Sequence, residues 1–270
     1  MNRIDAKFRA LRAAGHKGFV AYICAGDPNL RGTAQLARAF ERVGVDVLEL
    51  GVPFSDPLAD GVVNQLAAGR ALRSGTTLSG VLKTVASLRR GGLQVPIVFY
   101  AYYNVLHHYG LKKFVRDAAA TGVDGVLALD LPPEEADVFE KFMKRAGLHP
   151  IYLVAPTTPG ERIRKIARHA SGFIYYVSRE GVTGMQKSLA PAVRAHVATI
   201  RQHSKLPVAI GFGISTPAQA RAAARAADAV VVGSAIVNQI AKHSHDRRMT
   251  EHVARFVGAM VPGVKRRNTQ

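Results

Sequence analysis

Eight short apolar runs recur along the sequence, each five or six residues long, and the segments between them have helical spacing. Each run is rich in Val, Ile and Tyr and lacks clean alternation with polar residues, which is typical of strands covered on both faces of a parallel sheet. The runs are Phe19–Cys24, Val45–Leu50, Pro96–Tyr100, Gly125–Leu129, Pro150–Val154, Phe173–Val177, Pro207–Gly211 and Ala229–Gly233.

Several intervening segments end at a glycine, the usual helix stop, and Gly44, Gly122 and Gly147 are the clearest cases. Eight strand–helix units in a chain of 270 residues predict an α/β fold, a (β/α)8 barrel of the TIM type. An open doubly wound sheet is the alternative. The count of eight, without a second set of elements, favours the barrel.

We expect one domain over residues 1–270, because no linker rich in Pro, Gly or Ser divides the chain. An additional helix at residues 2–14 is expected to cap the barrel floor and to bury Ile4, Phe8 and Leu11. The basic tail from about residue 263 to residue 270 is expected to be flexible.

The composition predicts a cytoplasmic protein. Apolar residues make up 48% of the chain, and no apolar run reaches the roughly 18 residues that span a bilayer. The first residues have no apolar stretch behind their charges, so we expect no signal peptide. Cys24 is the single cysteine, which excludes an internal disulfide, and a small buried residue is the better interpretation than a nucleophile.

The net charge of +18 raises the question of nucleic-acid binding. Most basic residues are scattered over predicted surface helices, and the dense C-terminal run Lys265–Arg267 has no aromatic residues interleaved for stacking on bases. Solvated faces or an acidic protein partner are therefore favoured over nucleic acid.

In barrels of this type the active site lies at the carboxyl ends of the strands. Glu49 stands between two leucines at the end of the second strand, where it is a structural hydrogen-bonding group or a general acid and base with a raised pKa. Asp60 follows in the next loop. Its position before a predicted helix makes an N-cap the better local interpretation, although it also supplies a second carboxylate at the same mouth.

Glycine-rich loops after the last two strands predict a phosphate site. Gly213 and Gly233–Ser234 lie in loops that open helices, and backbone N–H groups at helix N-termini bind anions. Aromatic side chains are expected around the pocket, which suits a flat substrate; they are Tyr22, Tyr100, Tyr102, Tyr175 and Phe212.

Other candidates are weaker. The pairs His107–His108 and His243–His245 lie in polar stretches, so we expect no metal site. No lysine ends a strand where it would form a Schiff base, and Lys187 in a loop is the nearest candidate.

The run Leu48–Gly61, read LELGVPFSDPLADG, resembles the signature of the tryptophan synthase alpha chain family. Further similar segments are Ala25–Pro28, Ser178–Gly184, Gly211–Ser215 and Gly233–Val237, so that the resemblance extends over nearly the whole chain. The family cleaves indole-3-glycerol phosphate to indole and glyceraldehyde 3-phosphate by a retro-aldol reaction in tryptophan biosynthesis. The resemblance implies the same carbon–carbon lyase activity here.

The resemblance also implies residue roles. Glu49 would be the acid and base, and Asp60 would accept the indole N–H. Gly184, Gly213, Gly233 and Ser234 match phosphate-binding positions, Tyr175 matches the pocket wall, and Thr183 would meet Asp60 as two lids close.

A beta chain that carries pyridoxal phosphate is the implied partner in an α2β2 heterotetramer, and no cofactor is expected in this chain. The resemblance places Pro53, Asp56, Asn104 and Asp130 at that interface. Membrane and nucleic-acid partners are not expected.

The chain departs from the usual family pattern near the expected site, at Tyr22, Val62, Asn64 and Tyr100. Both added tyrosine hydroxyls need hydrogen-bond partners in an apolar pocket. Other functions stay open: a stand-alone indole-3-glycerol-phosphate lyase, another phosphate-binding barrel enzyme such as phosphoribosylanthranilate isomerase, or a basic nucleic-acid-binding protein.

Overall fold

The computed structural model describes residues 1–177, 191–211 and 213–265. Within this part, nine parallel strands form one sheet in the order β5-β4-β3-β2-β1-β9-β8-β7-β6. The strands are β1 Gly18–Cys24, β2 Val47–Gly51, β3 Ile97–Ala101, β4 Gly125–Ala128, β5 His149–Pro150, β6 Tyr152–Val154, β7 Ile174–Val177, β8 Val208–Gly211 and β9 Ala229–Val232.

The two strands at the ends of this order are one predicted strand divided in two. β5 pairs with β4, β6 pairs with β7, and only Ile151 lies between them, with its N–H bound to Val126 O at 2.9 Å. The chain itself therefore closes the sheet into a barrel. The eight-stranded barrel prediction is confirmed, with strand ends shifted by one or two residues, and the open sheet is excluded.

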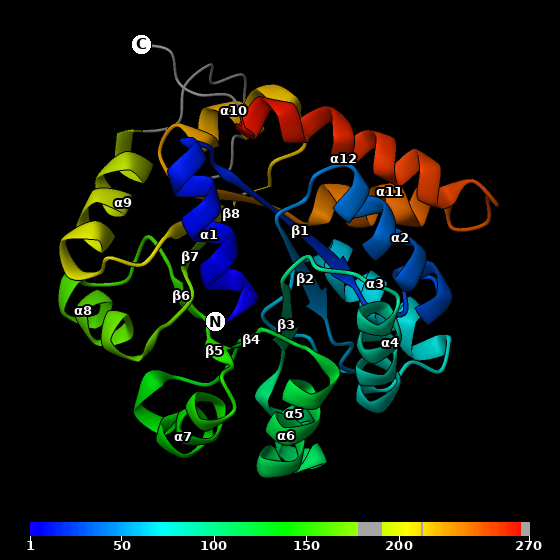
Figure 1. Cartoon of the computed structure of the whole chain (residues 1–270), viewed down its shortest axis with the longest axis horizontal. Coiled ribbons are helices and arrows are strands. Elements are labelled where there is room, and N and C mark those ends of the chain that lie inside the picture. Colours follow the sequence, from blue (N-terminus) through cyan, green and yellow to red (C-terminus); the bar gives the residue numbers. More distant parts are fainter. Residues whose placement is uncertain (178–190, 212, 266–270) are drawn as a thin grey trace.

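Helices surround the barrel, as Figure 1 shows. They are α2 Leu30–Arg42, α3 Val62–Arg73, α4 Leu78–Arg90, α5 Tyr103–Tyr109, α6 Leu111–Thr121, α7 Asp137–Arg145, α8 Gly160–His169, α9 Pro191–His203, α10 Pro217–Ala224, α11 Ser234–His243 and α12 Met249–Lys265, with a short 3-10 helix at Pro133–Glu135. The sequence did not predict α5, which has one buried residue, Leu106, and therefore little helical periodicity.

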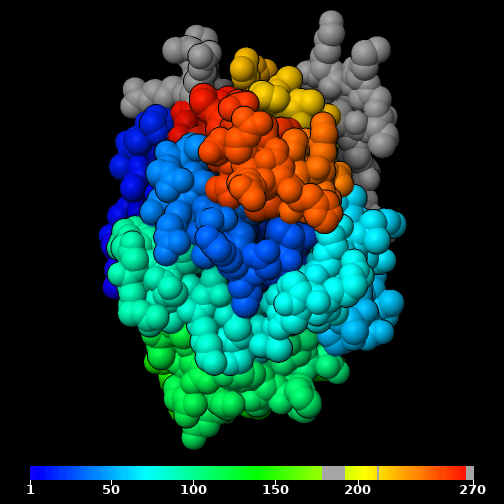
Figure 2. Space-filling model, turned by 90° about the vertical axis from the view of Figure 1, so that its right-hand side faces the viewer, coloured from blue at the N-terminus to red at the C-terminus, as the bar shows by residue number. Residues whose placement is uncertain are grey.

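The predicted N-terminal helix is confirmed as α1, Arg3–Ala14, which lies across one end of the barrel in Figure 1. Ile4, Phe8 and Leu11 are its buried residues, and the rings of Phe8 and Phe173 are 5.7 Å apart. In the side view of Figure 2, α1 lies at one end and α3 lies toward the other. The floor is thus filled, and the opposite end remains for a site.

In the described part of the chain, the apolar core has three clusters, and the two largest follow from strand alternation. Side chains such as Leu48 and Leu50 pack outward against the helices. Others, such as Val47 and Val98, fill the barrel interior beneath the mouth, together with the buried face of α1. Neighbouring residues of one strand therefore face opposite sides.

No helix in the described ranges is both long and apolar enough to cross a membrane. α12 runs to Lys265, so residues 263–265 of the expected flexible tail are helical, and the Lys265 ammonium lies 3.2 Å from Asp46 Oδ1. The remaining tail residues lie outside the described part of the chain.

Candidate active site

Glu49 lies on the interior side of β2, at the carboxyl-terminal half of the strand. Its register partners are Tyr22 on β1 and Val98 on β3. Because Leu48 and Leu50 face the helices, alternation turns the Glu49 side chain inward. The residue is only 1% exposed. This confirms that the glutamate faces the inside of the barrel.

The environment of Glu49 keeps a proton on it. Burial, and to a lesser extent the nearby Asp60 carboxylate, raises the pKa of the Glu49 carboxyl from 4.5 to about 8. Its Oε1 atom is buried without a hydrogen-bond partner among the described residues. A buried polar atom of this kind is costly unless a ligand satisfies it, so Glu49 has the features of a group that meets substrate.

Asp60 is held by two tyrosines. The Tyr100 hydroxyl donates to Asp60 Oδ1 at 3.0 Å, and the Tyr102 hydroxyl donates to Oδ2 at 2.9 Å. The N-cap of α3 is Gly61, and it makes no side-chain cap bond. The local interpretation of Asp60 as an N-cap is therefore wrong: two residues some forty positions away in sequence bind its carboxylate instead.

Asn64 is a further neighbour of Asp60. It lies in the first turn of α3, and its Nδ2 donates to Asp60 Oδ1 at 3.4 Å. Its Oδ1 is buried and has no partner among the described residues. The carboxylate can only accept, so it fixes which end of the Asn64 amide faces it. Glu49 and Asn64 thus both leave an oxygen available to a ligand.

Tyrosine rings line the interior beside the two carboxyl groups. The rings of Tyr22 and Tyr100 meet edge to face, 5.0 Å apart. The charges of Glu49 and Asp60 add to burial in raising the pKa of the Tyr175 hydroxyl, which places this ring within their field. A Cβ at Gly51 would lie 2.4 Å from the Tyr22 hydroxyl, and one at Gly211 would lie 2.5 Å from that of Tyr175. These two glycines are needed to admit the tyrosine rings.

Of the two helix N-termini predicted to bind an anion, one is already capped by side chains of the protein itself. Thr216 and Gln219 form a capping box at the start of α10. The start of α11 has Gly233 as its N-cap, without a side-chain cap bond, and Ser234 as its first residue. Gly213 lies ahead of α10 with φ +59°, exposed and with open space where a Cβ would be. Of the two, the N-terminus of α11, beside Tyr22, is therefore the one that no side chain caps.

Some of the predicted site residues cannot be placed. Phe212, Thr183 and Gly184 lie outside the described residues, as does Lys187. The second expected lid, residues 179–190, lies outside them as well.

Sequence reasoning missed an ion pair behind the site. Asp27, only 1% exposed, receives two bonds of 2.8 Å from Arg70. The pair ties the loop after β1 to α3, the helix that follows Asp60. The burial of Asp27, which makes a cationic partner necessary, is visible only in the structure, so no pattern in the sequence signals this pair.

The four expected partner-facing residues gather near the same end of the barrel. Asp56 and Asn104 are exposed, and the exposed Asp130 accepts from the Tyr103 N–H at 2.6 Å, next to Asn104. Pro53, by contrast, is buried.

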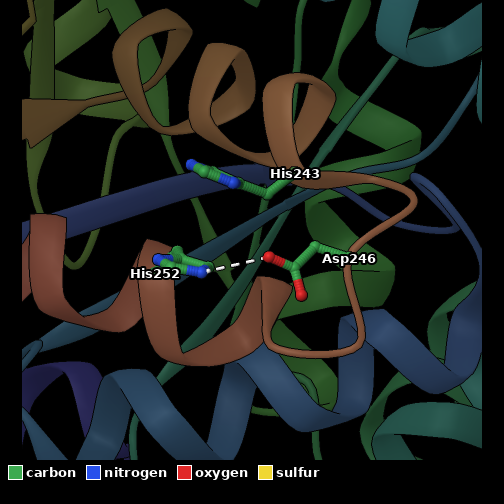
Figure 3. A group of neighbouring side chains, drawn as sticks. All are labelled: His243, Asp246 and His252. Carbon is green, nitrogen blue, oxygen red and sulfur yellow. Dashed lines mark hydrogen bonds and ion pairs between the residues drawn. The ribbon is translucent and has the colours of Figure 1, made fainter.

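The histidine candidates lie apart from the carboxyl groups in the fold. His107 and His108 are exposed on α5. His243 meets Asp246 and His252 between α11 and α12, as Figure 3 shows, with ligand atoms within 4.8 Å of one another. The two imidazoles are stacked, 4.4 Å apart and 14° from parallel, so their in-plane lone pairs do not converge on one point.

A cation in this cluster would lie beside Arg247 and Arg248, and the Asp246 carboxylate already binds His252 Nε2 and the Arg248 N–H. The interaction that holds this cluster is therefore the Asp246–His252 hydrogen bond at the start of α12. His245, the other predicted histidine of this pair, is not among the three.

A closed (β/α)8 barrel with a buried, protonated carboxyl and a second carboxylate at its mouth defines an enzyme of acid–base chemistry. The model of the family "Tryptophan synthase alpha chain" matches residues 8–265. The chain belongs to this family.

Curated relatives named tryptophan synthase alpha chain agree. That of Opitutus terrae is 51% identical over 98% of this chain and 100% of its own, and that of Geotalea daltonii is 50% identical over 98% and 99%. Tryptophan synthase subunit alpha from Legionella pneumophila has a TM-score of 0.90 at 37% identity, covering 98% of both chains.

Proposed function

We propose that the chain is the alpha subunit of tryptophan synthase, a carbon–carbon lyase that cleaves indole-3-glycerol phosphate to indole and glyceraldehyde 3-phosphate. The observation that carries the proposal is Glu49: a carboxyl buried in the barrel mouth, with a pKa of about 8 and an oxygen that lacks a partner. Neither the isomerase nor the nucleic-acid alternative is favoured, because the family match extends over nearly the whole chain.

Glu49 would move both protons of the reaction. In its neutral form it gives its proton to the indole ring carbon that carries the glycerol chain. As the carboxylate, it then removes the proton of the hydroxyl on the adjacent carbon. The carbon–carbon bond breaks, its electron pair returns to the ring, and the hydroxyl carbon becomes the aldehyde. One carboxyl with a pKa near neutrality suits both steps.

Asp60 would stabilise the positive charge that appears on the indole ring between these two steps. Protonation of the ring carbon makes the indole cationic, and the acidified ring N–H needs an acceptor. The Asp60 side chain, held by Tyr100 and Tyr102, is oriented before the substrate arrives. Such preorganisation stabilises the transition state more than the ground state.

The phosphate would lie at the N-terminus of α11, where Gly233 and Ser234 present backbone N–H groups. Gly213 would approach it from the neighbouring loop. The indole ring would then lie among Tyr22, Tyr100 and Tyr175, whose rings would supply the apolar wall.

A beta chain is the proposed partner, in an α2β2 assembly, with pyridoxal phosphate on the beta chain and no cofactor in this one. Leu58 on the Asp60 loop is 90% exposed, and Val62 and Leu66 on the next helix are 69% and 59% exposed. Adjacent exposed apolar side chains mark a protein contact. The proposal places the chain in the cytoplasm, in keeping with its single, unpaired cysteine.

The test is direct. Purified chain is incubated with indole-3-glycerol phosphate, and indole and glyceraldehyde 3-phosphate are quantified separately. The proposal predicts equal amounts of both products. Formation of neither product, by the isolated chain or with a cognate beta chain, would exclude the lyase activity.

A further inference from the structure

The carboxylate of Asp60 accepts three hydrogen bonds that are distributed unequally over its two oxygens. Oδ1 accepts from the Tyr100 hydroxyl at 3.0 Å and from Asn64 Nδ2 at 3.4 Å. Oδ2 accepts from the Tyr102 hydroxyl at 2.9 Å. A carboxylate offers about four lone-pair positions, two on each oxygen. Among the described residues, both positions on Oδ1 are therefore taken and one on Oδ2 remains.

Tyr100 is itself fixed in place. It lies on β3, in parallel register with Gly51 at the end of β2, and its ring meets that of Tyr22 edge to face. A side chain held by a strand and a neighbouring ring positions its hydroxyl more exactly than a loop residue does. Tyr102, at the N-cap of α5, instead ties the loop itself, because its oxygen also accepts from the Ala59 N–H at 2.9 Å.

We propose that Tyr100 is a positioning residue, which together with Asn64 occupies Oδ1 of Asp60 and so directs the substrate's ring N–H to Oδ2. This inference rests on the proposed function. Tyr100 touches the Asp60 carboxylate and acts through it. The expected consequence is that removing the Tyr100 hydroxyl impairs turnover only while Asp60 is in place.

The experiment is a double-mutant cycle with Tyr100→Phe, Asp60→Asn and both together, assayed for indole release. Tyr100→Phe keeps the ring and removes the donor, so we expect kcat to fall about tenfold, with KM within about threefold, from one bond to a charged acceptor. In the Asp60→Asn background the same change is expected to lower kcat by less than about twofold. An equal fall in both backgrounds would overturn the inference.

The matched control is Tyr109→Phe. Tyr109 also donates to an aspartate, Asp117 Oδ2 at 2.9 Å, but this pair joins α5 to α6 on the outside of the barrel. We expect its kcat to stay within about twofold of wild type, since no mechanism links that pair to the substrate. A tenfold fall in this control would show that loss of any tyrosine–aspartate bond acts through general destabilisation.

The four proteins of the cycle, which are wild type, the two single mutants and the double mutant, are also unfolded in urea. This experiment tests the contact between Tyr100 and Asp60 without any assay of activity. The inference predicts that Tyr100→Phe lowers the unfolding midpoint more in wild type than in the Asp60→Asn background. If wild type releases no indole, the proposed function fails, and the urea cycle alone decides whether Tyr100 holds Asp60. Additive midpoints would overturn that contact.

Discussion

The carboxylate of Asp60 lies close enough to Glu49 to raise the pKa of the Glu49 carboxyl beyond the effect of burial. The two residues thus have different roles: Glu49 is a neutral acid inside the barrel, and Asp60 is a hydrogen-bond acceptor at its rim. This difference lets one site protonate a ring carbon and accept the ring N–H at the same time.

The raised pKa of Glu49 implies that its ionisation opposes folding. Below pH 4.5 the group is protonated in both states and has no effect. As the pH rises from 4.5 to about 8, the unfolded chain ionises first and the folded state loses stability, and above 8 the loss is constant. We expect Glu49→Gln to stabilise the fold by on the order of 4 kcal/mol at pH 8.5, and far less at pH 5.

Urea unfolding at the two pH values measures this difference. Glu251→Gln, at an exposed position on α12, is the control and is expected to change stability by less than about 0.5 kcal/mol. A Glu49→Gln protein that is less stable than wild type at pH 8.5 would contradict the conclusion that burial raises the pKa of the Glu49 carboxyl.

For Asp60→Asn, we expect the loss to fall on kcat. The carboxylate stabilises charge that appears only once the ring is protonated, so about 100-fold or more in kcat is expected with a much smaller change in KM. Steady-state kinetics of indole release separates the two parameters. A change confined to KM would make Asp60 a binding residue alone.

The site shows where sequence reasoning succeeds and where it stops. Strand alternation was enough to place Glu49 inside the barrel, because Leu48 and Leu50 had to face the helices. Asp60 was misjudged as a cap, since its position before α3 was visible in the sequence and its partners Tyr100 and Tyr102 were not. The role of such a residue depends on contacts between distant parts of the chain, and local sequence spacing does not reveal these contacts.

The same limit explains two other differences. The Asp27–Arg70 pair joins residues 43 positions apart, so no local pattern shows it. The fifth predicted strand is one apolar run in sequence, but Ile151 divides it into β5 and β6 where the barrel closes.

The anion site at α11 can be tested without turnover. Glycerol phosphate is expected to raise the melting temperature, and Gly233→Asp is expected to remove the shift, because a carboxylate would stand at the anion's position. Gly160→Asp, which places the same charge at the start of α8, is the control and should keep the shift. A shift that persists in Gly233→Asp would locate the phosphate elsewhere.

The exposed Leu58 provides a test of the partner surface. We expect Leu58→Ser to weaken binding of the cognate beta chain about tenfold, as loss of one buried leucine would. Leu72→Ser, at the far end of α3, should bind normally. Titration calorimetry gives both affinities, and equal affinities for Leu58→Ser and wild type would place the beta chain elsewhere.

The most direct measurement of the central claim compares indole release by wild type and by Glu49→Gln, with each protein shown to be folded by circular dichroism. The glutamine has the size of the protonated carboxyl but cannot transfer a proton, so the rate is expected to fall by about 100- to 10,000-fold. Wild-type kcat/KM is expected to decline above pH 8, where Glu49 ionises. A Glu49→Gln protein within tenfold of the wild-type rate would contradict the role of Glu49 as the acid and base.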